Sequence, residues 1–213
     1  NSVQEFHDFT AEAFDTAQQY RIPVIILADA YLGQMREPCQ LRQSTETEKA
    51  HETGWEIGSG SADRERHVIN SLYTDLPEME KVNHRINDRL KQAADRETKW
   101  EEMGDEQPDI ILCAYGIMAR ICQTAVGWAR QQGISIRLFR PISLVPFPGK
   151  PLRELAQHAS YCIAAELSLG QFIEDVRLAI EGACPIGGYG RTGGVVCTPE
   201  DVLEHILEIA QRE

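Results

Sequence analysis

Residues 108–139 read PDIILCAYGIMARICQTAVGWARQQGISIRLF, and this stretch decides the fold. It contains the apolar run Ile110–Ala114, a helical pattern over Ile117–Gln132, and a second apolar run, Ile134–Phe139. Gly133 separates the helical pattern from the second run, where a glycine commonly ends a helix. This order predicts a βαβ unit, because two parallel strands are joined by a crossover that is usually a helix.

The alternation of short apolar runs and helical segments continues to the end of the chain. We expect a helix beginning near Pro151, a strand over Tyr161–Ala165 and a further helix over Gln171–Glu181. The last helix should begin at Thr198, a favourable N-cap that is followed by a proline. We therefore expect residues 108–213 to form a Rossmann-like α/β domain with a mostly parallel sheet.

The first forty residues contain one expected helix and one expected strand. Ser2-Val3-Gln4-Glu5 matches a capping box, so a helix should begin almost at the first residue. The run Ile22–Ala28 is typical of a strand buried on both faces. One helix and one strand do not make a domain, and the chain does not begin with Met. We therefore expect residues 1–40 to be the tail of a domain whose earlier part lies upstream.

Residues 41–107 are polar, and we expect them to form an acidic connector without strands. Gly58-Ser59-Gly60-Ser61 is predicted to be a flexible point within it. Apolar residues recur every three or four positions between Asp75 and Met103, which predicts a long amphipathic helix. Such a helix can bind a partner through its apolar face, but packing within its own protein is the more common use.

Composition excludes several classes of protein. The formal net charge is −12, ten units of which belong to residues 1–107, and no basic stripe is present to bind nucleic acid. No apolar run is long enough to span a membrane and no signal peptide precedes the first helix, so a cytoplasmic protein is expected. The six cysteines include no CxxC pair. Buried apolar thiols are therefore expected in preference to disulfides or iron–sulfur ligands.

The candidate functional edge of the sheet is the one at which the parallel strands end. Tyr115, Arg140 and Glu166 each follow an expected strand directly, and so does the Gly187–Gly194 loop. Arg140 and Glu166 could form an ion pair between neighbouring loops, with either a structural or a functional role. Arg120 lies in the first turn of its helix, where the helix dipole disfavours a cation. A carboxylate of a partner domain or a bound anion should compensate it, unless the side chain is simply solvated.

Residues 188–193 match the pattern GxGxxG of dinucleotide-binding loops. The match lies near the end of the domain and not in the first βα turn. No acidic residue follows at the needed distance within a further strand, where it would bind a ribose. We therefore expect no nucleotide here.

The order and spacing of several short motifs resemble the alpha-type subunits of 2-oxoacid:ferredoxin oxidoreductases over nearly the whole chain. These motifs are Ser2-Val3-Gln4-Glu5, Pro23–Asp29, Leu32-Gly33-Gln34-Met35, Ala114-Tyr115-Gly116, Arg140-Pro141-Ile142, Pro146-Phe147-Pro148, Glu166, Gly170-Gln171 and Tyr189-Gly190-Arg191. Residues 68–73 and 100–103 are most similar to the branched-chain (2-oxoisovalerate) members. The 2-oxoglutarate and pyruvate members are close alternatives.

This resemblance implies a heteromeric enzyme that oxidatively decarboxylates a 2-oxoacid to an acyl-CoA and passes electrons to ferredoxin. Residues 1–40 would be the tail of a thiamine pyrimidine-binding domain, and residues 108–213 would form a transketolase C-terminal-like domain. Residues 41–107 would connect the two domains. Thiamine diphosphate, Mg²⁺ and [4Fe-4S] clusters would be held by other parts, including beta-type and gamma-type subunits. No catalytic, cofactor-binding or metal-binding residue is then expected in this chain.

Six residues are candidates for a subunit interface or an anion-binding edge: Tyr115, Arg120, Arg140, Glu166, Gln171 and Arg191. The alternative to a role as part of an enzyme subunit is a non-enzymatic Rossmann-type module. Such a module would bind an anion or a partner through Arg120, Arg140 and Arg191.

Overall fold

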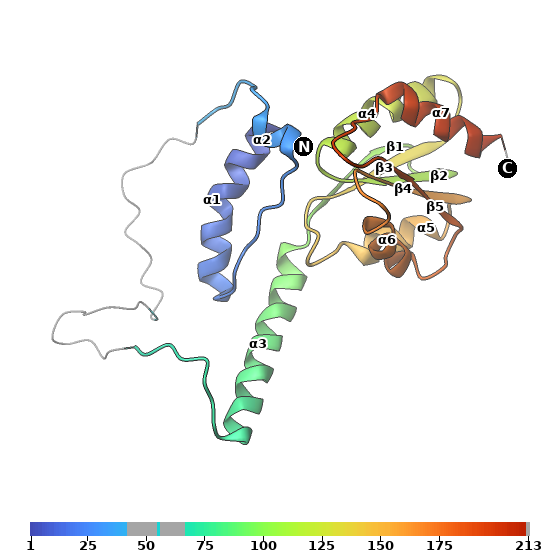
Figure 1. The fold of residues 1–213 in the computed structure, drawn as a ribbon. Coiled ribbons are helices and arrows are strands. Elements are labelled where there is room, and N and C mark those ends of the chain that lie inside the picture. Colours follow the sequence, from blue (N-terminus) through green and yellow to red (C-terminus); the bar gives the residue numbers. More distant parts are fainter. Residues whose placement is uncertain (42–54, 56–66, 212–213) are drawn as a thin grey trace. The chain divides into compact units, whose positions relative to one another are not determined.

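The computed structural model describes residues 1–41, 55 and 67–211 (Figure 1). They form two compact units, each described by itself below. The sheet unit comprises Asn1–Val3, Ala28–Glu37 and Ala94–Glu213, and the helical unit comprises Gln4–Leu27 and Pro38–Ala93. The predicted flexible point at residues 58–61 lies outside the described residues.

The sheet unit is built on five strands in the order β1-β3-β2-β4-β5. β2 (Ile110–Ala114), β3 (Ile136–Pro141), β4 (Tyr161–Glu166) and β5 (Ile186–Gly190) are parallel. β1 (Trp100–Gly104) runs antiparallel to β3 at one edge. β2, β3 and β4 are almost entirely buried, as their continuous apolar sequences predict for strands covered on both faces. The expected mostly parallel, Rossmann-like fold is confirmed.

Two pairs of helices cover the two faces of this sheet (Figure 1). α4 (Gly116–Gln131) and α7 (Pro199–Ala210) pack on one face, where they share a core with alternate residues of β2. α5 (Gly149–Ala156) and α6 (Phe172–Ile180) pack on the other face. Each fully buried Ile, Leu, Val or Phe of these cores contributes about 1.5–3 kcal/mol to folding.

The predicted helix boundaries in the sheet unit agree with the structure to within about two residues. Thr198 caps α7 in a capping box with Asp201, and Pro199 occupies the first helical position. Gly133 follows the last turn of α4 with φ +83°, the left-handed conformation that only glycine adopts without strain.

The two edge strands, β1 and β5, were not predicted from the sequence. Trp100–Gly104 was expected to be connector, yet it forms β1, and α3 (Leu76–Glu97) ends before it. Residues 187–190 were expected to be loop, yet they belong to β5. An edge strand has only one neighbour and one well-covered side, so it does not need the continuous apolar sequence of a central strand. Two glutamates in β1 and three glycines in β5 removed that signal.

The helical unit contains most of α1 (Val3–Tyr20) and α3, both of which were predicted. The strand expected over Ile22–Ala28 is absent, and that prediction is wrong for this structure. Val24, Ile25 and Leu27 are 38%, 80% and 73% exposed. A strand requires a second segment to bind its backbone N–H and C=O groups, and no described segment of this unit is a strand. An apolar sequence alone does not supply that partner.

None of the described helices is long and apolar enough to cross a membrane.

α2 (Ala30–Gln34) is a short helix of the sheet unit, and Asp29 caps it by accepting a hydrogen bond from the backbone N–H of Leu32.

Candidate functional site

Glu166 ends β4 at the carboxyl edge of the sheet and is 3% exposed. Its carboxylate accepts hydrogen bonds from the backbone N–H groups of Gln171, Phe172 and Ile173 at 3.0, 3.1 and 3.1 Å. The Ser168 hydroxyl donates a further bond to it. These N–H groups begin α6, whose N-cap residue supplies no side-chain bond of its own. Glu166 therefore acts as the cap of α6, and its charge lies where the helix dipole favours an anion.

The pKa of Glu166 shows that this environment favours the ionised carboxylate. Burial on its own raises the pKa, but the hydrogen bonds from Ser168 and from the three backbone N–H groups outweigh it, and the pKa is lowered. An ionised carboxylate with four donors around it has little capacity left to take up a proton. Its geometry is that of a structural anion and not of a general acid or base.

Asp29 occupies the N-terminus of α4 in the same way. One carboxylate oxygen caps α2, and the other accepts a hydrogen bond from the backbone N–H of Ile117 at 3.1 Å. Gly116 has φ +58°, and a Cβ at that position would lie 3.1 Å from the same oxygen. Sequence reasoning missed this contact. A helix-capping aspartate could have been found from the sequence, but a bond to a residue 88 positions away could not.

Arg120 is compensated by a carboxylate of this chain, Glu37. Its Nη1 atom lies 2.5 Å from Oε1 of Glu37, and Oε2 of Glu37 accepts a bond from the backbone N–H of Val3 at 3.1 Å. The Val3 bond and then the Arg120 guanidinium lower the pKa of Glu37. The expectation that something acidic compensates Arg120 is met here, within the chain itself, by a residue that had not been singled out.

Arg140 and Glu166 do not pair, so that expectation is wrong. Arg140 is 5% exposed, and its Nη1 atom lies 2.6 Å from Oε2 of Glu101 in β1. β2 lies between β3 and β4, so the two residues are not on neighbouring strands. The order of strands in the sheet cannot be read from the order of strands in the chain.

The remaining candidates gather around Glu166. The backbone N–H of Gln171 binds its carboxylate, and the backbone N–H of Arg191 binds its carbonyl oxygen at 3.2 Å. The ring of Tyr115 packs edge-on against Phe172 with centroids 4.9 Å apart. Burial, followed by the charge of Glu166, raises the pKa of Tyr115. The structure thus brings Tyr115, Gln171 and Arg191 to Glu166, whereas Arg120 and Arg140 pair elsewhere.

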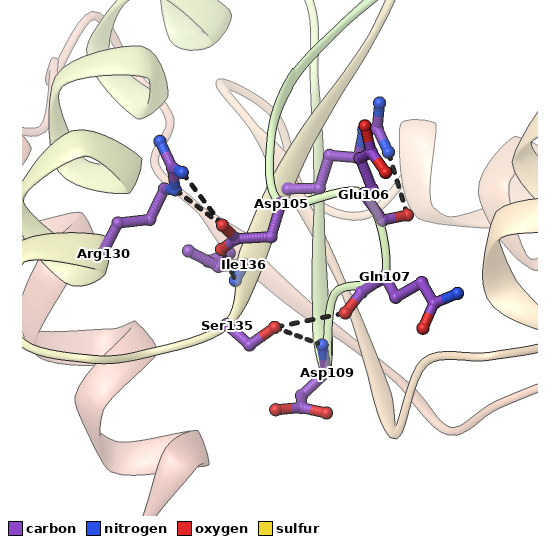
Figure 2. Close-up of polar contacts among 8 residues, drawn as sticks. Asp105, Glu106, Gln107, Asp109, Arg130, Ser135 and Ile136 are labelled. Carbon is purple, nitrogen blue, oxygen red and sulfur yellow. Dashed lines mark hydrogen bonds and ion pairs between the residues drawn. The ribbon is translucent and has the colours of Figure 1, made fainter.

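The amino edge of the sheet carries a second polar network, which Figure 2 shows. Asp105 accepts bonds from Nε and Nη2 of Arg130 at 3.1 and 2.9 Å, and from the backbone N–H of Ile136 at 3.1 Å. The Ser135 hydroxyl donates to the carbonyl of Gln107 and accepts from the backbone N–H of Asp109. These contacts tie the turn after β1 to the loop before β3. Arg130, followed by the Ile136 N–H, lowers the pKa of Asp105.

Side chains of the kinds that commonly ligate metals do not gather in the described part of the chain. No three His, Cys, Asp or Glu side chains of the described part converge as metal ligands. Five of the six cysteines are buried free thiols, as predicted, and Cys39 is half-buried. Burial and then the neighbouring Cys162 raise the pKa of Cys113, so it remains a thiol and not a metal-binding thiolate. No catalytic step through thiamine diphosphate follows from these side chains.

Comparison with known proteins now identifies the class. Residues 1–104 match the family model "Pyruvate flavodoxin/ferredoxin oxidoreductase, thiamine diP-bdg", and residues 108–202 match "Pyruvate:ferredoxin oxidoreductase core domain II". The two matches follow one another along almost the whole chain. The chain belongs to the thiamine diphosphate-dependent 2-oxoacid:ferredoxin oxidoreductase family, and within it to the alpha-type subunits, as the sequence motifs predicted.

The relatives favour the branched-chain members of this family. The chain is 40% identical over 210 residues to ketoisovalerate oxidoreductase subunit VorB of Methanothermobacter marburgensis, and 38% identical to VorB of Methanothermobacter thermautotrophicus. It is 27% identical to 2-oxoglutarate synthase subunit KorA of M. marburgensis. The VorB matches cover 99% of this chain but 59% of each relative. The chain therefore spans about three fifths of the length of these relatives.

A solved structure supports the fold. The 2-oxoglutarate:ferredoxin oxidoreductase of Magnetococcus marinus superimposes with a TM-score of 0.72 over 94% of this chain and 39% of that chain, at 16% identity.

Proposed function

We propose that this chain is the C-terminal part of an alpha-type subunit that serves a branched-chain 2-oxoacid:ferredoxin oxidoreductase without supplying catalytic residues. The observation that carries the proposal is that three helix N-termini at the carboxyl edge of the sheet are capped by carboxylates of this chain. Asp29 caps α4, Glu166 caps α6, and Asp201 takes part in the capping box of α7. In an α/β protein that binds its ligand at this edge, helix N-termini such as these contact the ligand.

The same edge is suited to contact with another subunit. The loops after β3, β4 and β5 each carry an exposed apolar residue: Val145, Leu169 and Val195 are 96%, 78% and 54% exposed. Exposed apolar side chains on several loops of one edge are candidates for a protein interface. We propose that Tyr115, Arg120, Arg140, Glu166, Gln171 and Arg191 support this interface by holding its loops.

Residues 1–40 are proposed to complete a thiamine pyrimidine-binding domain, and residues 41–107 to connect it to the domain over 108–213. The exposed run Ile22–Ala28 supports this division, because an apolar segment without a strand partner is expected to pair with a sheet supplied elsewhere. In the assembled enzyme, thiamine diphosphate with Mg²⁺ and the [4Fe-4S] clusters belong to other parts, including beta-type and gamma-type subunits, and CoA and ferredoxin are partners of the whole assembly.

The test is co-expression of the complete subunit with its neighbouring subunits, followed by anaerobic, CoA-dependent dye reduction with a panel of 2-oxoacids. The higher identity to VorB than to KorA leads us to expect the largest kcat/KM with 2-oxoisovalerate. A higher kcat/KM with 2-oxoglutarate or pyruvate would agree with the proposed family but would show that the proposed substrate is wrong. Absence of turnover in a complex that contains its clusters would contradict the proposed activity.

Calorimetry tests the division of labour separately. Residues 1–213 alone should not bind thiamine diphosphate with Mg²⁺, because no three His, Cys, Asp or Glu side chains of the described part converge as metal ligands. Binding with a micromolar Kd would show that the chain holds the cofactor and would overturn the proposed division.

The alternative, a Rossmann-type module that binds anions through Arg120, Arg140 and Arg191, finds less support. Arg120 and Arg140 each have a carboxylate partner, and the N-terminus of α4, the helix that carries Arg120, is capped by Asp29. Sulfate should therefore fail to protect the sheet unit against thermal unfolding. Protection that disappears in Arg140→Ala would favour the module.

A further inference from the structure

A basic face runs along α3 in the helical unit. Lys81, Arg85 and Arg89 are spaced by four residues, so their side chains project from the same face of the helix. With neighbouring residues they line a pocket of about 590 Å³. Its lining residues are Gln19, Tyr20, Lys81, His84, Arg85, Asp88, Arg89 and Gln92. No basic stripe was expected from the linear sequence, because Glu80, Asp88 and Asp95 interrupt it.

The arginines of this pocket differ from those of the sheet unit in their partners. Six arginines of the sheet unit pair with carboxylates: Arg120, Arg130, Arg137, Arg140, Arg153 and Arg177. Within the described ranges, Arg85 and Arg89 form no ion pair. Lys81 lies 3.7 Å from Glu78, but both side chains are mostly exposed, and such pairs contribute little. Among the described residues that line the pocket, Asp88 is the acidic one.

The positive charges are also close enough to repel one another. Burial lowers the pKa of Arg89, and the charges of Arg21 and Arg85 lower it further. A guanidinium remains protonated at neutral pH in spite of such a shift, so the repulsion persists in the folded protein. A bound anion would remove it. In a chain with a net charge of −12, two neighbouring arginines without an ion pair among the described residues call for a specific explanation.

The size and donors of the pocket indicate the chemical class of the ligand. Its volume lies within the range of roughly 300–1,000 Å³ that is common for small-molecule sites. Guanidinium groups bind phosphate through two parallel N–H bonds, and Lys81 adds a point charge. A long polyanion such as nucleic acid needs a basic surface more extended than one pocket.

We propose that this pocket binds a phosphorylated small molecule through its phosphate groups. None of its residues belongs to the carboxyl edge of the sheet, so the inference is independent of the proposed function. The ligand chemistry, phosphate, is common to inorganic phosphates and to nucleotides.

The experiment uses the complete subunit in its native complex. Binding of inorganic phosphate, pyrophosphate and adenosine triphosphate is measured by calorimetry at fixed ionic strength, with sodium sulfate as a comparison. Binding of at least one phosphate compound is expected, and the compound that binds most tightly distinguishes a free phosphate from a nucleotide. The double variant Arg85→Gln/Arg89→Gln should weaken that binding at least about tenfold, because each charge-assisted hydrogen bond contributes about this factor or more.

The matched control is Lys91→Gln/Arg96→Gln, which removes the same charge from α3 at two positions that do not line the pocket. It should bind as the wild type does. Lys81→Gln/Arg85→Gln is a second pocket variant for the case that Arg85→Gln/Arg89→Gln does not fold, because both of its side chains are exposed. It should also weaken the binding of the phosphate compound. The proposal is overturned if no phosphate compound binds at millimolar concentration. It is also overturned if Arg85→Gln/Arg89→Gln and the control Lys91→Gln/Arg96→Gln weaken binding equally.

Discussion

At the scale of single residues, carboxylates of this chain take the places that ligands take in many α/β proteins. Glu166 lies at the start of α6, Asp29 at the start of α4, and Asp201 at the start of α7. Each binds backbone N–H groups that would otherwise be available to a phosphate or a substrate carboxylate. The arrangement stabilises the fold and leaves these three helix N-termini with little binding capacity of their own.

Glu166→Gln should lower the free energy of unfolding by about 1–3 kcal/mol at neutral pH. The neutral amide lacks the charge that strengthens the four hydrogen bonds to Glu166, and it has only one oxygen to accept them. The folded-state pKa of Glu166 lies below its unfolded value, so its contribution is complete above the unfolded value and disappears as the pH falls through the folded one. Urea unfolding from pH 7 to pH 3 checks this. The gap between wild type and variant should narrow below about pH 4.

Glu174→Gln is the matched control for this change. Glu174 lies in the first turn of the same helix, but it is exposed and pairs only with Arg177. Its loss should change stability by less than about 0.5 kcal/mol. Equal effects of the two variants would mean that the helix dipole, and not the bonds to Glu166, accounts for the stability.

The candidate residues were predictable as positions but not as contacts. Tyr115, Arg140 and Glu166 were expected at the ends of strands, and the structure places them there or within one residue. The partners of Arg120 and Arg140 were not predictable, because Glu37 and Glu101 are 83 and 39 residues away in the chain. Such contacts depend on strand order and on segments outside the domain predicted from the sequence.

At the scale of elements, the turn that ends β1 is held by a glycine. Gly104 has φ +131°, and a Cβ there would lie 2.3 Å from the carbonyl oxygen of Ile136. Gly104→Ala should therefore destabilise the sheet unit by about 2–4 kcal/mol through strain and overlap. Thermal unfolding of the variant measures this. Loss of less than about 1 kcal/mol would show that β1 can move away from β3 without cost.

Gly127→Ala provides the opposite case within the same unit. Gly127 lies inside α4, and a Cβ there would meet no atom within 4 Å. Alanine should stabilise this helix by about 0.5–1 kcal/mol, because glycine loses more backbone freedom on folding. The two substitutions add the same methyl group and should shift Tm in opposite directions.

Elements were predictable where burial imposes a pattern. β2, β3 and β4 are covered by helices on both faces, so continuous apolar runs marked them in the sequence. The apolar run Ile22–Ala28 carried the same signal but is not a strand here. An apolar run predicts that a segment can be buried, but not that it forms a strand. A strand also needs a neighbouring segment with free backbone hydrogen-bonding groups.

At the scale of the whole molecule, the two units should differ in their dependence on the rest of the enzyme. The sheet unit has cores on both faces of its sheet, whereas the helical unit leaves several large apolar side chains exposed. Phe14, Ile25, Leu27 and Leu72 are more than two thirds exposed. We therefore expect the sheet unit to fold without partners and the helical unit to gain its stability on assembly.

Hydrogen exchange measured by mass spectrometry checks this expectation. Amides of residues 22–28 should exchange within seconds in the isolated chain and should be protected in the assembled complex, while β2 and β4 should be protected in both. Rapid exchange of residues 22–28 in the assembled, active complex would remove the support for a strand pairing there.

The three glycines of β5 have a consequence for how this protein tolerates variation. A Cβ would lie 2.5 Å from the Tyr161 hydroxyl at Gly187, 3.3 Å from Ile173 at Gly188, and 2.6 Å from the carbonyl oxygen of Ser168 at Gly190. In a saturation-mutagenesis library, Gly190 should therefore reject nearly every replacement although it lies on an edge strand, because the atom it would meet belongs to the backbone. Gly187 and Gly188 should tolerate more, because they would meet the ends of side chains that can move. An invariant glycine at position 190 would then imitate the footprint of a nucleotide-binding loop, while the selected property is the close approach of a neighbouring chain segment.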